Sequence, residues 1–247
     1  MTGASSFPPT RHIGILVFDK FEPVDVWGFV EAFSIARFIG TGYASGPPYP
    51  FDIKLISNEI KPGSGDPRPA PVQSMNGPSV APDLFRDEAL HRSPPFDLLM
   101  IPGGEGTRRL LGADPGTVEA LMTWVRGMDA IQPSMLMTSV CTGAAILARA
   151  GLLDRRPAAT NHEAFAWVVG FGPRVLWDNV ARWVDAGRYV TSAGVSAGTD
   201  MAFHLVSRLA GRAVAETAAI SAEYDWRRDP NQPTFYPQQA VVPTGSS

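Results

Sequence analysis

The chain has 247 residues, a formal net charge of −3 and a sequence pI of about 5.8. A chain without an excess of basic groups attracts neither a nucleic-acid backbone nor an acidic membrane surface, so we expect neither as a partner. No stretch approaches the roughly 20 apolar residues of a membrane helix, and residues 1–11 lack the apolar core of a signal peptide, so we expect a cytoplasmic protein.

Strand and helix patterns alternate along most of the chain. Residues 13–18 form an apolar run interrupted only by Gly14, which is typical of a strand buried on both faces of a parallel sheet. Residues 24–35 then carry apolar side chains at helical spacing. Further strands are predicted at 51–57, 97–101 and 135–140, and further helices at 118–126 and 142–150. The alternation predicts an α/β fold with a mostly parallel sheet covered by helices.

The C-terminal part of the chain has a different pattern. Residues 181–184 and 189–191 flank an Asp-Ala-Gly turn, which predicts a β-hairpin. Residues 196–208 then continue as an amphipathic helix.

We expect one folded domain spanning residues 1–247, because the length lies within the range of single α/β domains. The segment 61–71 is rich in Pro and Gly and is predicted to be an exposed loop inside that domain, since the strand and helix pattern resumes after it. The ends, at about 1–11 and 229–247, are predicted to be loosely packed tails.

The strongest local signal surrounds the single cysteine, Cys141. In residues 135–148 an apolar strand, a turn of small residues and a helix follow one another without a loop, and Cys141 lies at the junction. We expect the start of the helix to favour the reactive thiolate, and backbone N–H groups near Thr142 to stabilise developing negative charge. A small buried apolar side chain is the alternative role for Cys141, and the local pattern leaves both open.

A second feature is Ile-Pro-Gly-Gly-Glu-Gly at residues 101–106, directly after a predicted strand. Small residues there let backbone N–H groups approach a ligand closely. It is not a dinucleotide fingerprint, because G-x-G-x-x-G is absent. By itself such a segment is more often an ordinary turn, so its value depends on proximity to Cys141.

A serine hydrolase is a competing interpretation, because residues 194–198 match G-x-S-x-G with Ser196 as nucleophile. That fold needs an acid and then a histidine downstream, yet the only later histidine, His204, lies on the same predicted helix. We therefore disfavour it. No metal is predicted, because the chain has one cysteine and its histidines lack metal-ligand spacing to Cys or carboxylates: His12, His91, His162 and His204.

The Ser-Val-Cys-Thr-Gly segment at 139–143, with the Pro-Gly-Gly turn upstream, resembles the ThiJ/PfpI superfamily over about residues 13–229. Similar blocks occur at residues 23–28, 159–162 and 191–201. The resemblance implies a class I glutamine-amidotransferase-like fold: a flavodoxin-like three-layer sandwich with a mostly parallel sheet and Cys141 on a nucleophile elbow. It also implies a homodimer.

Many members of this superfamily place a Glu near the nucleophile and a His directly after it, whereas the matching positions here are Asp25 and Thr142. That combination resembles the isonitrile hydratase branch, whose members hydrate R–NC to an N-substituted formamide without a cofactor. From the residues alone, Asp25 is equally well an exposed residue at a helix N-terminus. The resemblance implies catalytic roles for Cys141, Asp25 and Thr142, and substrate or oxyanion binding by Gly103, Gly104 and His162.

The chain departs from the common sequence of that branch at Trp27, Asn161 and Glu163, which leaves the substrate open. Glyoxalase or deglycase chemistry on small dicarbonyls is an alternative that Asp25 and Thr142 disfavour. A redox sensor in which Cys141 is oxidised is a non-enzymatic alternative. We disfavour a transcriptional regulator, because the short Pro-rich stretch beyond Arg228 cannot supply a helix-turn-helix.

Overall fold

The computed structural model describes residues 7–42, 45–64 and 67–232. Its centre is a six-stranded sheet in the order β2-β1-β5-β6-β10-β9, in which β9 is antiparallel to β10 and every other pair is parallel. The strands are β1 (Arg11–Val17), β2 (Phe51–Ser57), β5 (Leu98–Ile101), β6 (Leu136–Ser139), β9 (Trp183–Ala186) and β10 (Tyr189–Ser192). The predicted α/β class with a mostly parallel sheet is confirmed.

The central strands are apolar because they are covered on both faces. Every residue of β5 and β6 is buried. The predicted strand at 51–57 coincides with β2, and the predicted bounds of β1, β5 and β6 are within two residues of the observed ones. Arg11, assigned above to a loose tail, is the first residue of β1 and pairs with Phe51, so that boundary was wrong.

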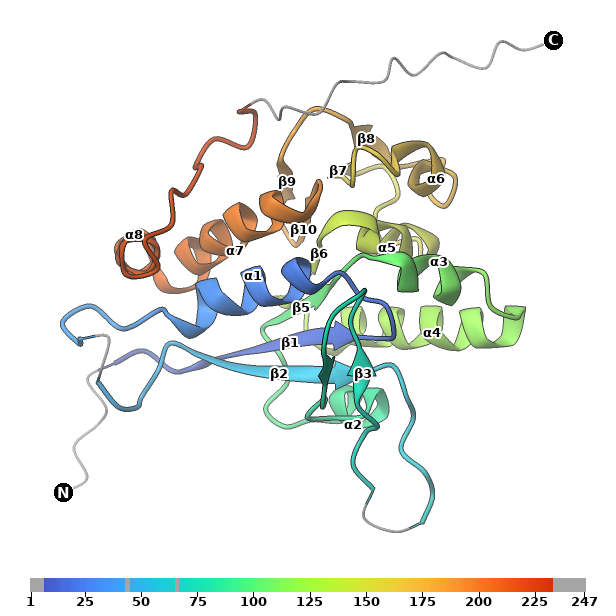
Figure 1. The fold of residues 1–247 in the computed structure, drawn as a ribbon, viewed down its shortest axis with the longest axis horizontal. Helices are drawn as coiled ribbons and strands as arrows, with labels where there is room; N and C mark the ends of the chain where they lie inside the picture. Colours follow the sequence, from blue (N-terminus) through green and yellow to red (C-terminus); the bar gives the residue numbers. More distant parts are fainter. Residues whose placement is uncertain (1–6, 43–44, 65–66, 233–247) are drawn as a thin grey trace.

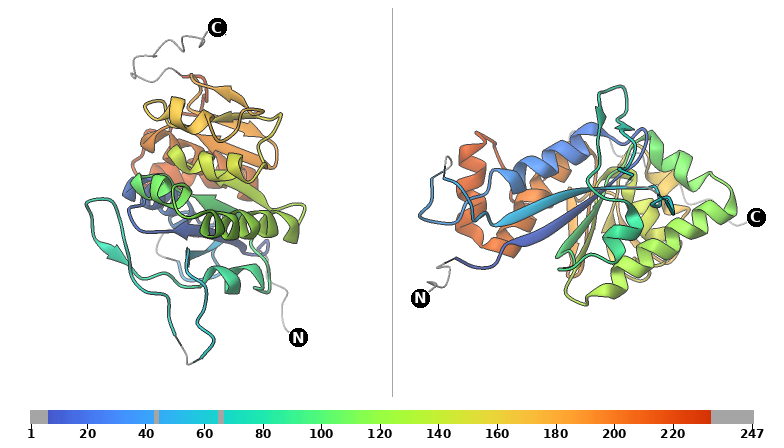
Figure 2. Two further views of the ribbon diagram at one scale, coloured as in Figure 1. Left: turned by 90° about the vertical axis from the view of Figure 1, so that its right-hand side faces the viewer. Right: turned by 90° about the horizontal axis from the view of Figure 1, so that it is seen from below.

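Helices cover the sheet on both faces, which gives the expected three layers (Figures 1 and 2). One face carries α1 (Pro23–Ser34), α7 (Val195–Ala210) and α8 (Arg212–Ser221). The other carries α3 (Glu105–Leu111), α4 (Pro115–Ile131) and α5 (Ala144–Arg149), with α2 (Arg86–Leu90) next to α4 and α6 (Phe165–Val169) next to α5. Within the described ranges no helix is long and apolar enough to span a bilayer.

Two predicted helices differ in extent from the observed ones. Helix α4 is longer than the predicted 118–126 because it is capped early: Asp114 Oδ1 accepts a hydrogen bond of 3.0 Å from the Thr117 N–H, and Pro115 opens the first turn. The predicted helix at 142–150 is instead a 3₁₀ turn, Cys141–Gly143, followed by α5.

Several elements were not predicted from the sequence, and most of them are short. They include α2, α3, α6 and α8, the antiparallel pair β3 (Val72–Gln73) and β4 (Ser79–Val80), and the parallel pair β7 (Pro157–Ala159) and β8 (Leu176–Asp178). The predicted hairpin is confirmed as β9 and β10, with Tyr189 opposite Ala186 and Gly187 at φ 79° in the turn.

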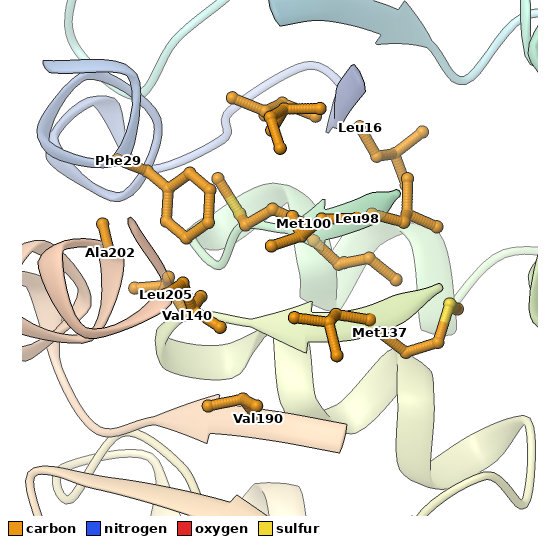
Figure 3. Close-up of a cluster of buried hydrophobic side chains, with 14 of the residues drawn as sticks. Leu16, Phe29, Leu98, Met100, Met137, Val140, Val190, Ala202 and Leu205 are labelled. Carbon is orange, nitrogen blue, oxygen red and sulfur yellow. The ribbon is translucent and has the colours of Figure 1, made fainter. Parts of the chain in front are cut away.

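The hydrophobic core between the sheet and the helices holds α1 in its position on the sheet. Figure 3 shows Phe29 of α1 and Leu205 of α7 on the same side of the sheet as Met100 and Val140. Phe29 is fully buried, a burial that stabilises the fold by about 1.5–3 kcal/mol. This packing holds the first turn of α1 at the carboxyl ends of β1 and β5.

That edge is where open α/β sheets bind ligands. Strand β1 lies between β2 and β5, so the chain leaves β1 toward one side of the sheet and later returns on the other. A crevice forms at such a switch point, outside the carboxyl ends of the two strands. Residues 102–104, 141–143 and the start of α1 all lie there.

The predicted C-terminal tail is partly ordered. The Arg182 N–H donates a hydrogen bond of 2.7 Å to the Pro230 carbonyl, which places residues near 230 against the start of β9. Residues 1–6 and 233–247 of the two predicted tails lie outside the described residues.

Candidate active site

Cys141 lies on a sharp turn that neighbouring strands hold in a strained conformation. Its φ angle is +57°, a left-handed conformation that costs a non-glycine residue about 1–2 kcal/mol. The Cys141 N–H donates to the Ala193 carbonyl over 3.0 Å, and the Cys141 carbonyl accepts from Thr160 Oγ1 over 2.8 Å. Backbone strain that the surrounding structure enforces in this way is typical of functional sites.

The Pro-Gly-Gly turn after β5 packs directly on this elbow. A Cβ atom at Gly103 would lie 2.6 Å from the Thr142 nitrogen and 2.8 Å from the Cys141 Cβ, so only glycine fits. The Gly103 carbonyl accepts a hydrogen bond of 2.9 Å from the Glu22 N–H. The turn therefore joins the elbow to the loop that leads into α1.

Asp25 projects into this junction from the first turn of α1. Asp25 is only 1% exposed, so the interpretation of Asp25 as an exposed helix-terminus residue was wrong. Oδ2 accepts a hydrogen bond of 2.8 Å from the Gly103 N–H, whereas Oδ1 has no hydrogen-bond partner among the described residues. Burial, with a smaller effect from Glu22, holds the pKa of Asp25 well above its usual value, although the Gly103 bond opposes this.

Burial and the neighbouring charge of Asp25 also raise the pKa of the Cys141 thiol. Hydrogen bonds to the sulfur from the Thr142 N–H and the Asn161 side chain act in the opposite direction but are weaker. The expected lowering by the helix N-terminus was wrong, because Cys141 opens a three-residue 3₁₀ turn and is only 6% exposed. Since the charge of Asp25 opposes ionisation of the adjacent thiol, two negative charges side by side at this pair are disfavoured.

Thr142 joins the same cluster through its hydroxyl. Thr142 Oγ1 accepts a hydrogen bond of 3.1 Å from the Gly104 N–H, and the Thr142 hydroxyl donates a hydrogen bond of 3.2 Å to Thr107 Oγ1. The N–H groups of Gly103 and Gly104 thus already donate to protein oxygens, to Asp25 and Thr142 respectively. Their binding of substrate or developing charge stays a prediction that requires an exchange of partners.

His162 lines a cavity of about 650 Å³, and the described residues that line this cavity include neither Cys141 nor Asp25. Residues of the same cavity include Asn161, Glu163, Ser196 and Arg227. Burial lowers the pKa of His162, and a hydrogen bond between its ring and the Ala181 backbone opposes that effect. Asn161, which sequence reasoning noted only as a departure from the family pattern, acts to lower the pKa of Cys141.

The serine-hydrolase interpretation receives no support from the geometry. Ser196 lies in the first turn of α7, and His204 is two turns further on, roughly 12 Å along the helix. The His204 Nε2 atom is 2.7 Å from Asp185 Oδ2. Among the residues that the structure describes, no cluster of three or more His, Cys, Asp or Glu side chains is suited to a metal ion.

A cysteine on a strained elbow, a buried carboxyl and a Pro-Gly-Gly turn at the switch point of a parallel sheet define a class of α/β proteins. The DJ-1/PfpI family model matches residues 11–208, and the chain belongs to this family.

Comparison with known proteins identifies relatives of differing function. An isonitrile hydratase from Pseudomonas putida is 29% identical over 62% of this chain and 61% of the relative. The HTH-type transcriptional regulator GbdR of Pseudomonas aeruginosa is 32% identical over 65% of this chain and 40% of the relative. The chain thus spans less than two thirds of either. The crystal structure of a ThiJ/PfpI family protein from Pseudomonas syringae has a TM-score of 0.67 at 25% identity, covering 88% of this chain and 76% of that one.

Proposed function

We propose that this protein hydrates an isonitrile to an N-substituted formamide, with Cys141 as the nucleophile. The observation that carries the proposal is the buried pair itself: Asp25 has one oxygen held by Gly103 and the other without a described partner, beside the Cys141 sulfur. Isonitrile hydration needs a nucleophile and a proton donor at one carbon, and such a pair provides both. The similarity to an isonitrile hydratase supports the same reaction.

The first step starts from the form of the pair that holds one proton. The Cys141 sulfur forms a bond to the terminal carbon of R–NC, and the proton passes to the same carbon through Asp25. The product is a thioimidate, R–N=CH–S–Cys, next to an Asp25 carboxylate. Thr142, whose hydroxyl is fixed by Gly104 and Thr107, orients the sulfur through its N–H.

The second step returns the enzyme to its starting state. Asp25 takes a proton from water as the hydroxide oxygen bonds to the thioimidate carbon, and the same proton then moves to the nitrogen. The new hydroxyl gives its proton to Asp25 as the C–S bond breaks, which releases R–NH–CHO and the Cys141 sulfur. The sum is R–NC plus water to the formamide.

The test is formamide production from cyclohexyl or para-nitrophenyl isonitrile, with the product identified by mass spectrometry. The wild type is compared with Cys141→Ala and Asp25→Asn. We expect turnover in the wild type and its loss in both variants. Wild-type protein that is folded but inactive on both compounds would refute the hydratase proposal.

Ligand binding without turnover is the second candidate, because a transcriptional regulator is also among the relatives. The burial of Cys141 disfavours a role as a peroxide sensor, since a thiol with a raised pKa reacts slowly with oxidants. If no formamide forms, a rise in melting temperature with isonitriles or small dicarbonyls would favour the binding function.

We further propose that the protein forms a homodimer. Val24 and Trp27 of α1 are 47% and 43% exposed, and such apolar side chains are suited to an interface next to the site. Light scattering at several protein concentrations tests this, and a mass of one chain throughout would refute it.

A further inference from the structure

Three hydrogen bonds hold the backbone of the elbow at Cys141. The Cys141 N–H donates to the carbonyl of Ala193, directly after β10, over 3.0 Å. The Cys141 carbonyl accepts a hydrogen bond of 2.8 Å from the hydroxyl of Thr160, directly after β7. The preceding residue, Val140, donates to the Ile101 carbonyl of β5 over 3.0 Å. Cys141 keeps its φ angle of +57° between these three contacts.

The bond from Thr160 is the one that a side chain provides. The bonds to Ala193 and Ile101 join backbone atoms, so substitutions of those side chains do not remove them. Thr160 is fully buried, so a carbonyl that loses its hydroxyl donor there does not exchange it for bulk water. A substitution of Thr160 therefore removes one restraint on the elbow while the side chains of Cys141 and Asp25 stay unchanged.

The position of Thr160 is itself fixed by the strands next to the elbow. The N–H of Ala159, the preceding residue, donates a buried hydrogen bond of 2.8 Å to Thr191 Oγ1 of β10. Thr191 in turn lies opposite Ser139, the last residue of β6 before the elbow. The Thr160 hydroxyl is thus attached to the same strands that carry Cys141, which gives it a defined place from which to hold the turn.

We propose that Thr160 is a positioning residue, which keeps Cys141 in the left-handed conformation that places its side chain beside Gly103 and Asp25. Gly103 marks that place: its N–H donates to Asp25 Oδ2 over 2.8 Å, and a Cβ atom built on it would lie 2.8 Å from the Cys141 Cβ. The left-handed conformation is unfavourable for a residue with a Cβ atom, so loss of the restraint shifts the turn toward negative φ. The effect of Thr160 on turnover rests on the proposed hydratase function, whereas its effect on the turn does not.

A relaxed turn changes two reactions of the Cys141 sulfur in opposite directions. Hydration needs the sulfur and the Asp25 carboxyl at one carbon atom, so a displaced sulfur lowers kcat. Alkylation by iodoacetamide needs only the thiolate, which burial and the charge of Asp25 disfavour in the native position. A sulfur that leaves this position ionises more readily and is alkylated faster. Faster alkylation together with slower turnover is therefore the signature of a positioning role.

The test compares Thr160→Val, which removes the hydroxyl and keeps the branched shape, with Thr160→Ser, which keeps the hydroxyl. Cys141 is the only cysteine of the chain, so alkylation reports this sulfur alone. In Thr160→Val we expect alkylation at pH 8 to accelerate about three- to tenfold. We expect kcat for formamide production to fall about ten- to hundredfold, with KM little changed. Thr160→Ser should return both rates close to those of the wild type.

The matched control is Thr138→Val in β6, three residues before the nucleophile. Thr138 is also fully buried, and its hydroxyl donates to the Leu99 carbonyl of the neighbouring strand over 3.0 Å. This variant should lower the urea midpoint by as much as Thr160→Val does, yet leave the alkylation rate unchanged. If Thr160→Val does not fold, Thr191→Val replaces it, because it removes the acceptor that fixes the segment before Thr160.

An alkylation rate in the folded Thr160 variant, or in its replacement, that does not exceed that of Thr138→Val would overturn the proposal. Equal acceleration in Thr138→Val would also overturn it, because a general loss of stability would then explain the result. Accelerated alkylation confined to the Thr160 variant, in a protein whose wild type forms no formamide, would uphold the role of Thr160 and refute the hydratase function alone.

Discussion

Two buried aspartates of this protein have opposite surroundings. Asp200 on α7 is fully buried and pairs with Arg182, whose Nε lies 3.0 Å from Oδ2. Its other oxygen accepts from the Tyr224 hydroxyl and the Arg227 N–H, each over 3.0 Å. Asp25 is equally buried, but it has one hydrogen bond of 2.8 Å and an oxygen without a described partner.

The difference separates a buried carboxylate whose charge is satisfied from a buried carboxyl whose charge would not be. A buried charge is tolerated when a counter-ion and hydrogen bonds satisfy it, as at Asp200, and it then connects α7 to the segment after α8. A buried carboxyl without a counter-ion resists ionisation and keeps a proton available. At Asp25 the fold therefore accepts a cost in stability next to Cys141, which is common at functional sites.

The largest expected effect is the loss of activity in Cys141→Ala. Removal of the proposed nucleophile should lower formamide production by more than about a thousandfold, because the proposed covalent intermediate could no longer form. The product assay measures this, with the urea midpoint as a control for folding. Activity within tenfold of the wild type would exclude Cys141 as the nucleophile.

Asp200→Asn should give the largest loss of stability. Arg182 is only 3% exposed, and the substitution leaves its guanidinium without a counter-ion. Breaking a buried pair in this way costs about 3–5 kcal/mol. Equilibrium urea unfolding measures the change. A loss below about 1 kcal/mol would remove the distinction between the two aspartates.

The pH dependence of stability should identify Asp25 as the unsatisfied group. Because its folded pKa is raised, its contribution is fully present below the unfolded pKa of about 3.9 and is lost as pH rises through the folded pKa. Asp25→Asn lacks this loss, so the variant should gain stability relative to the wild type as pH rises from 4 toward 8. Parallel curves for the two proteins would contradict the assignment.

Thr142→Val should have the smallest effect. It removes a hydroxyl that contacts the Gly104 N–H and Thr107, and one such hydrogen bond contributes about 1 kcal/mol. We expect a similar loss in unfolding free energy and roughly a tenfold loss in turnover, since the N–H that contacts the sulfur remains. A loss of activity as large as in Cys141→Ala would assign Thr142 a direct chemical role.

Much of the fold was accessible from the sequence because long apolar runs have few other interpretations. The strand at 51–57 was predicted with its observed bounds, and Cys141 was placed at a strand-to-turn junction. The site was only partly accessible. Burial of Asp25 depends on contacts between distant segments, such as its hydrogen bond to Gly103, 78 residues away. The raised pKa of Cys141 depends on the neighbouring Asp25 and on burial in a turn type that the local pattern does not specify.

The most direct test of the central claim measures activity and stability together in Asp25→Asn. Asparagine keeps an oxygen that accepts from the Gly103 N–H, but its amide is not acidic enough to donate a proton. General acid catalysis at the isonitrile carbon is therefore expected to be lost. We expect formamide production to fall by about 10²–10⁴-fold while stability at pH 7 stays equal to or exceeds that of the wild type. Retained activity, or activity lost only because the variant unfolds, would contradict a catalytic role for Asp25.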